Sequence, residues 1–130
     1  MRTWVFVTLA VYAIVFAVGG VWNHLHDLIV SGLDAYRYAP QPFRVFFIAL
    51  VVIDAAVLVL LVLRRPAAPI LAAVVTALDL IGNWISDWQY YHDDPGWLVG
   101  NKGGLIQLTV FGIFVGVTAV PLRRALQRRR

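Results

Sequence analysis

Four long apolar segments dominate this sequence and constrain its fold more than any other feature. They run from about Trp4 to Leu25, Phe43 to Leu63, Ala67 to Trp88 and Gly103 to Leu122. A helix needs about 20 apolar residues to cross a bilayer, and each segment is about that long. The strands of a membrane β-barrel would be shorter and would alternate polar with apolar residues. These segments do not alternate, so the sequence predicts four membrane-spanning helices.

Composition and spacing support one membrane domain over residues 1–130. Hydrophobic residues make up 61% of the chain and charged residues 14%, against about 45–50% and 25% in ordinary soluble domains. The first span has a longer apolar part than a signal peptide and no A-x-A cleavage site, so we expect a retained helix. Only Arg64-Arg65-Pro66 separates the second and third spans, which predicts a tight antiparallel hairpin. The expected fold is an all-α, integral membrane four-helix bundle with antiparallel up-down topology.

Basic residues predict the orientation through the positive-inside rule. With both termini cytoplasmic, eight basic residues lie inside and Arg37, Arg44 and Lys102 lie outside. No acid falls inside, and a belt of Trp and Tyr falls at the outer boundary, so we expect a plasma (inner) membrane of the bacterial type. We interpret the basic tail as a topology determinant and anionic-lipid contact, not a nucleic-acid site. The inside set is Arg2, Arg64, Arg65, Arg123, Arg124, Arg128, Arg129 and Arg130.

The two outer connections carry different signals. Residues 28–41 contain Ser31-Gly32 and end at Pro40-Gln41-Pro42, so this stretch is expected to hold a short interfacial helix ended by the prolines. Residues 89–102 contain Asp94-Pro95-Gly96 and Gly100, which predicts a turn-rich loop.

Polar residues inside the spans are the strongest functional signal. At about 100° per residue, Asp79, Asn83 and Asp87 share a stripe with Thr76 and Ser86 on the third helix. The opposite side carries Leu78, Ile81 and Ile85. A charge in hydrocarbon costs at least about 2.5–3.5 kcal/mol, so the stripe should face inward. On the first helix, the same arithmetic puts Gly19, Gly20, Asn23, His26 and Asp27 on one side, with His24 pointing elsewhere, and the glycines should allow close helix approach.

Asp54 in the second span and Asp79 in the third are expected to meet near mid-membrane. Asp54 lies eleven residues after Phe43, and Asp79 twelve after Ala67, in two antiparallel helices. Two carboxylates at low dielectric without a basic partner repel each other, so one should hold a proton. Such a pair either relays protons or holds a cation, or it serves only as hydrogen-bonding glue between helices.

The remaining motifs are weaker. His24, His26 and His92 lie at the outer boundary near several aspartates, which raises the hypothesis of a divalent-metal site. The alternative is polar capping in the headgroup zone, and no metal-binding sequence motif is present. The chain has no cysteine, so thiolate ligands and nucleophiles are excluded. Gly112 and Gly116 form a G-x-x-x-G pattern, which favours helix packing within the chain, in a homo-oligomer or with a membrane-complex partner.

These features favour binding or transport of a proton, cation or small polar solute through a polar cavity open to the outer face. An accessory or assembly subunit of a larger membrane complex is one alternative. A metal-dependent membrane enzyme acting on a lipid is another, although the sequence shows no catalytic residue. The expected ligand or ion site comprises Asp54, Asp79, Asn83, Asp87, Asn23, His26 and Asp27, with Gln107 close to it.

The basic asymmetry gives a testable orientation. A topology reporter fused after Arg130 should read cytoplasmic, and one inserted near Gly96 should read external, because basic residues resist translocation. A cytoplasmic signal from the Gly96 insertion would overturn the orientation.

Overall fold

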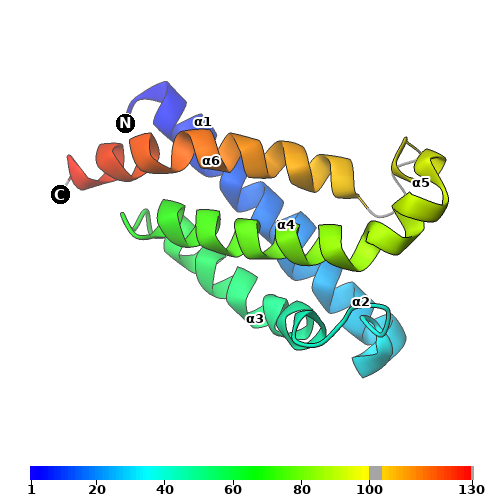
Figure 1. Cartoon of the computed structure of the whole chain (residues 1–130). Helices are drawn as coiled ribbons and strands as arrows, with labels where there is room; N and C mark the ends of the chain where they lie inside the picture. The colour runs from blue at the N-terminus through cyan, green and yellow to red at the C-terminus, as the bar shows by residue number, and fades with distance from the viewer. Residues whose placement is uncertain (100–103, 130) are drawn as a thin grey trace.

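The computed structural model describes residues 1–99 and 104–129, and every regular element in those two ranges is a helix. Four helical segments are long and apolar enough to cross a membrane: Thr3–Asp34, Phe43–Val62, Ala68–Asp93 and Leu105–Gln127. They confirm the prediction of an all-α chain with four long apolar helices. Both chain termini lie at the same end of the molecule (Figure 1).

The first long segment is composite and the others are regular α-helices. It begins with α1 and continues through a π-helical stretch, η1, into α2 and a short 3₁₀ turn, η2. The bounds are α1 Thr3–Ile14, η1 Val15–Trp22, α2 Asn23–Ser31, η2 Gly32–Asp34, α3 Phe43–Val62, α4 Ala68–Asp93, α5 Pro95–Val99 and α6 Leu105–Gln127.

Two predicted loops differ from the structure. The first segment continues as helix to Asp34, so residues 28–41 hold no separate interfacial helix; α2 ends where Gly32 takes a φ of 61°. The third span runs past Trp88 to Asp93, and α5 follows at Pro95. There the Gly96 N–H donates to the Asp94 side chain over 3.1 Å, a local bond typical of an Asx turn. Residues 100–103 of the predicted loop lie outside the described residues.

The turn between α3 and α4 is as tight as predicted. Arg64 adopts a left-handed conformation with a φ of 56°. Its N–H donates to the Leu61 carbonyl, and the Arg65 N–H donates to the Leu60 carbonyl, both over 3.0 Å. This pair of bonds is the Schellman pattern, which satisfies the last carbonyls of a helix. The turn therefore reverses the chain within five residues and lays α4 against α3.

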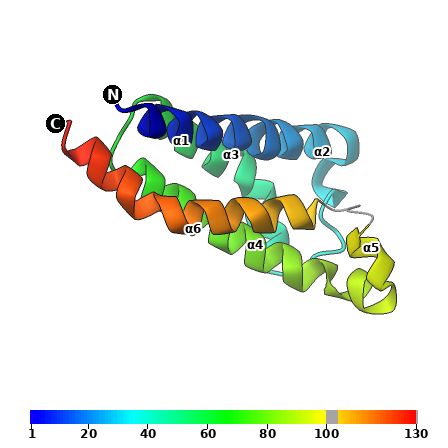
Figure 2. The same ribbon diagram turned by 90° about the horizontal axis from the view of Figure 1, so that it is seen from above.

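The four long segments are close together at one end and separate toward the other. α4 packs along α6, and η1 packs along α3, while α3 also contacts α4. α1 contacts α6 near the chain termini. Figure 1 shows the rod formed by α1 to α2 crossing α6 and moving away from it toward the end that carries α2, and Figure 2 shows the same rod moving away from α4 toward that end.

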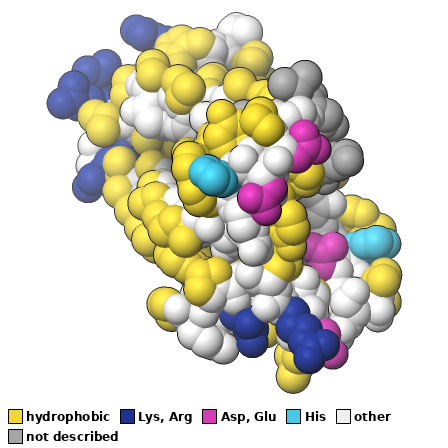
Figure 3. Space-filling model, turned by 45° about the vertical axis from the view of Figure 1, so that its right-hand side comes forward, with side chains coloured by type: hydrophobic (Ala, Val, Ile, Leu, Met, Phe, Trp, Pro, Cys, Tyr) yellow, Lys and Arg dark blue, Asp and Glu magenta, His cyan; other side chains and the backbone are white. Residues whose placement is uncertain are grey.

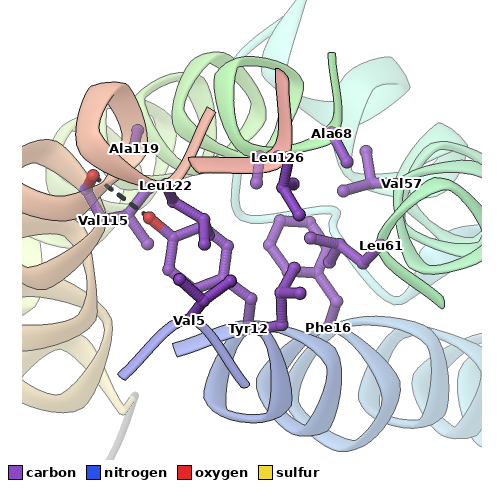
Figure 4. Close-up of a cluster of buried hydrophobic side chains, with 12 residues drawn as sticks. Val5, Tyr12, Phe16, Val57, Leu61, Ala68, Val115, Ala119, Leu122 and Leu126 are labelled. Atoms are coloured by element: carbon purple, nitrogen blue, oxygen red, sulfur yellow. Dashed lines mark hydrogen bonds between the residues drawn. The ribbon is translucent and has the colours of Figure 1, made fainter. Parts of the chain in front are cut away.

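An apolar core fills the end near the termini. Tyr12 of α1 is fully buried, between Phe111 and Phe114 of α6, which meet its ring edge-on. The Thr118 hydroxyl donates to the Phe114 carbonyl over 2.7 Å, so its oxygen accepts from the Tyr12 hydroxyl at 2.6 Å. Figure 4 shows Tyr12 among the buried side chains of the core, with the hydrogen bond of 3.3 Å from its hydroxyl to the Val115 carbonyl. The core residues around it are Val5, Leu9, Phe16, Val57, Leu61, Ala68, Ala72, Val115, Ala119, Leu122 and Leu126.

The two glycines of the G-x-x-x-G pattern have different surroundings. A Cβ added at Gly112 would lie 3.0 Å from Leu80 Cδ2 of α4, so this glycine permits close packing within the chain. A Cβ at Gly116 would meet nothing within 4 Å. Packing by Gly112 is therefore confirmed, whereas the expectation that Gly116 also faces another helix of this chain is wrong.

This difference predicts opposite outcomes for two matched substitutions. Gly112→Leu should lower the stability of the purified protein by about 1–3 kcal/mol, because it overpacks the contact with α4. Gly116→Leu should change it by less than about 1 kcal/mol. Thermal unfolding in one detergent compares them directly, and equal destabilisation by both would contradict the packing described.

Candidate functional site

A polar cavity of about 670 Å³ lies where the long segments separate. Its walls come from η1, α2, the connection after η2, α3, α4 and the start of α6. Asn23, Tyr38 and Gln107 are exposed at its rim, so the cavity is open to the surface. Phe16 and Phe111 lie at its inner side, next to the apolar core. Its polar lining consists of Asn23, His24, Asp27, Tyr36, Tyr38, Asp54, Thr76, Asp79, Asn83 and Gln107.

Asp54 is the single residue that α3 contributes to the cavity wall, and it is 3% exposed. Gly20 of η1 packs directly on it: an added Cβ would lie 2.6 Å from the Asp54 Oδ2 atom and 2.9 Å from its carboxyl carbon. The predicted close approach at this glycine is therefore confirmed. Any larger residue at position 20 would displace the carboxyl group.

Asp79 lines the same cavity from α4, half-buried, and its carboxyl is held by Asn83 one turn later. The Asn83 amide nitrogen donates to Asp79 Oδ1 over 2.7 Å and to the Asp79 carbonyl over 2.8 Å. Both amide hydrogens are thereby used, so the Asn83 side chain has only its oxygen left to offer a ligand. Asn83 thus positions one carboxylate and adds a further acceptor.

A chain of three polar side chains forms another part of the wall. The Tyr36 hydroxyl donates to Asp27 Oδ2 over 3.0 Å, and His24 Nδ1 lies 2.6 Å from the same hydroxyl oxygen. The Tyr36 hydroxyl has one proton and donates it to the Asp27 carboxylate. His24 Nδ1 must therefore be protonated and donate its hydrogen to the Tyr36 oxygen. A neutral His24 then keeps Nε2 as an acceptor. Tyr36 is one of the tyrosines of the outer aromatic belt, and the sequence did not predict it at this site.

Burial controls the charge of the two tyrosines in this wall. Burial raises the pKa of Tyr36, and its hydrogen bond to Asp27 adds to the effect. Burial also raises the pKa of Tyr38 to about 12, with the Asp87 carboxylate as the next cause. Both phenols therefore remain neutral hydrogen-bond donors and acceptors at physiological pH.

The π-helical segment explains why His24, and not His26, reaches the cavity. A π-helix makes i→i+5 bonds, so each residue turns less about the axis than in an α-helix. Segment η1 therefore rotates Gly19 and Gly20 relative to α2, toward the side on which His24 lies. His26 is exposed and its ring lies 6.2 Å from that of Trp22. The assumption of a regular helix reversed the two histidines.

Asp87 is buried but does not line the cavity. Residues four apart on an α-helix drift by about 40° per step, so the stripe that begins at Asp79 and Asn83 has turned by about 80° at Asp87. The charge of Asp87 acts on Tyr38 instead. Of the seven residues expected at the site, the structure brings together Asp54, Asp79, Asn83, Asn23 and Asp27, and leaves out Asp87 and His26.

The structure does not support the hypothesis of a metal site built from the histidines. In residues 1–99 and 104–129, no group of three or more His, Asp or Glu side chains is arranged to hold a metal ion. His24 is engaged with Tyr36, whereas His92 is 70% exposed near the end of α4, 3.7 Å from Asp93. The helices carry the three rings to different places, so His24, His26 and His92 form no common site.

The charges of the cavity wall are one-sided. Its lining includes the carboxyl groups of Asp27, Asp54 and Asp79, and none of the lining residues in the described part of the chain is Lys or Arg. Figure 3 shows acidic and histidine side chains at the centre and right of the visible face, basic side chains at its left, and a second group of basic side chains near its lower edge. The cavity therefore offers acceptors and negative charge to any molecule that enters it.

Fold and site together define a helical membrane protein with a polar cavity open at one end. No family model matches the chain, and no curated protein or solved structure is similar to it. Its function is therefore inferred from the geometry of the cavity.

The chain of His24, Tyr36 and Asp27 predicts a specific loss of stability. Tyr36→Phe should destabilise the purified protein by about 1–3 kcal/mol, because Asp27 and His24 lose their common partner. Tyr38→Phe is the matched control and should change stability by less than about 0.5 kcal/mol. Thermal unfolding measures both, and equal effects would contradict the assigned role of Tyr36.

Alkaline pH gives a second measure of the same residue. A phenol whose pKa is raised on folding stabilises the fold below its unfolded pKa, which is about 10, and this contribution is lost as pH rises above that value. The loss of stability above pH about 10 should therefore be smaller in Tyr36→Phe than in the wild type. Identical pH profiles would contradict the burial of a neutral Tyr36.

Proposed function

We propose that this protein binds a small cationic solute in the polar cavity, with Asp54 and Asp79 as the principal counter-charges. The observation that carries the proposal is the one-sided charge of the wall: three carboxyl groups and no Lys or Arg among the described lining residues. Carboxylates at low dielectric need a proton or a cation, since unpaired charges there are poorly solvated. A bound cation satisfies that requirement.

The size and chemistry of the cavity support an organic cation or a hydrated ion over a bare one. A volume of about 670 Å³ lies within the range of about 300–1,000 Å³ typical of small-molecule sites. The aromatic rings of Phe16, Phe111 and Tyr36 also line it, and such rings attract organic cations through their π faces. The acceptors of Asn23, Asn83 and Gln107 are suited to ammonium or guanidinium hydrogens.

The closed end of the molecule supports the proposal that a solute reaches the polar cavity from one side only. Beyond Phe16 and Phe111 the apolar core around Tyr12 fills the space between α1 and α6. A solute bound next to Asp54 therefore enters and leaves through the rim formed by Asn23, Tyr38 and Gln107. Transport across the membrane would require the Tyr12–Thr118 contact to open, and the proposal is limited to binding from the open side.

Binding of defined probes to purified protein tests this proposal. Na⁺, guanidinium and tetramethylammonium would each be titrated while the midpoint of thermal unfolding is followed. At least one should raise the midpoint in the wild type, and Asp54→Asn or Asp79→Asn should weaken that binding by about 10–100-fold, the value of one charge-assisted contact.

Two further variants make the test specific. Asp34→Asn removes one exposed acid outside the cavity and should leave binding unchanged. Gly20→Ala keeps every charge but displaces the Asp54 carboxyl, so it should weaken binding as well. If none of the probes binds, or if Asp34→Asn weakens binding as much as Asp79→Asn, the proposal is wrong.

A further inference from the structure

A second cavity, which we call the basic groove, lies at the end of the molecule that carries the termini. It measures about 660 Å³ and lies between the start of α1 and the last turns of α6. Four guanidinium groups line it, from Arg2, Arg124, Arg128 and Arg129. Trp4, Val5 and Pro121 supply its apolar walls. The groove lies at the other end of the molecule from the polar cavity and is independent of the proposed function.

The arginines of the groove have no compensating charge within the described part of the chain. The one ion pair found there joins His92 to Asp93. All seven acids lie between Asp27 and Asp94 in the sequence, and no acid lines the groove. Four like charges around one depression repel one another, so the groove is stabilised by any anion that enters it.

The start of α1 adds to this positive potential. Arg2 is the N-cap residue of α1 and makes no side-chain capping bond, and no acid occurs in the first turn. The free N–H groups and the dipole of a helix N-terminus favour an anion at the same place. The fixed fork of an arginine side chain matches the geometry of phosphate oxygens.

The position of the groove along the membrane-spanning helices indicates which kind of anion it binds. α1 and α6 are both long enough to cross a membrane, and the groove lies where both reach their ends. That is the headgroup level of a bilayer, where Trp4, 41% exposed, would lie among the interfacial groups. The groove therefore combines arginine side chains suited to a phosphate group with an apolar wall on which the first acyl carbons can pack.

From this arrangement we infer that the basic groove binds the phosphate headgroup of an anionic phospholipid. Arg124 in the last turn of α6 and Arg128, the C-cap residue four positions later, hold the phosphate oxygens, and Arg2, the N-cap residue of α1, closes the groove from the other side. Trp4 and Val5 contact the glycerol and upper acyl region. The lipid thereby holds the ends of α1 and α6 together, next to the Tyr12 core.

Native mass spectrometry of the full chain, released from nanodiscs, tests the inference. The nanodiscs would contain equal amounts of phosphatidylglycerol and phosphatidylcholine, and the retained lipids would be counted. The wild type should retain phosphatidylglycerol in clear preference. The double variant Arg124→Gln/Arg128→Gln should lose about 30-fold of that preference, the effect expected for two arginines at an anionic headgroup.

A matched variant separates the groove from the overall charge. Arg65→Gln/Arg123→Gln removes two positive charges that lie outside the groove and should keep the preference for phosphatidylglycerol. Equal loss in both double variants would show general electrostatics and overturn the inference. Equal retention of the two lipids by the wild type overturns it without any variant.

A last arm distinguishes lipid from free anion. Inorganic phosphate, added at millimolar concentration to detergent-solubilised protein, should raise the unfolding midpoint less than phosphatidylglycerol does at the same concentration. If phosphate alone reproduces the whole effect, the groove is a site for a soluble anion and the inference of a lipid site is wrong.

Discussion

A carboxylate inside a membrane-spanning helix has to be shielded from hydrocarbon. The rest of this structure depends on how Asp54 and Asp79 are shielded. Asp54 is enclosed by Gly20 of η1, and Asp79 is held by Asn83 within α4. Each arrangement brings the carboxyl to the same polar cavity and away from lipid. The apolar faces of α4, including the exposed Leu78, Ile81 and Ile85, are thereby left for the lipid side. A cavity lined by acids follows directly from this division.

The two ends of the molecule differ in the side chains that lie between the long segments. Near the termini, Tyr12 and its phenylalanine neighbours bring α1 and α6 into contact around an apolar core. Toward α2 and α5 the long segments separate and polar side chains line the gap. Four arginines line the groove at the closed end, and three aspartates line the cavity at the open one. The proposed sites for a cation and for an anionic lipid therefore lie at different ends of one small protein.

Sequence reasoning predicted the parts of this arrangement that depend on apolar length and on a short turn. Four helices followed from the length of the apolar segments, and the placement of Asp54 and Asp79 on the wall of one cavity followed from the tight Arg64–Pro66 turn. Tyr36 was not predicted, because it reaches the cavity from an irregular connection whose path no periodicity describes. His24 lines the cavity in place of the expected His26 for a different reason. The π-helical turn at Val15–Trp22 changes the rotation of each residue about the helix axis, and no sequence pattern predicts this turn. Helix ends past Trp88 were missed because polar residues such as His92 and Asp93 can continue a helix beyond the membrane.

Cysteine accessibility is the most direct test of a solvent-filled, cation-binding cavity, and the absence of native cysteine makes it simple. Asn83→Cys would be placed on the cavity wall, and Ile81→Cys on the exposed apolar face of α4, in protein reconstituted into sealed vesicles. A membrane-impermeant maleimide should modify Asn83→Cys from one side only, at least one of Na⁺, guanidinium and tetramethylammonium should slow that reaction, and Ile81→Cys should remain unmodified in hydrocarbon. An Asn83→Cys thiol as unreactive as that of Ile81→Cys, or one whose reaction none of the three cations slows, would contradict the account.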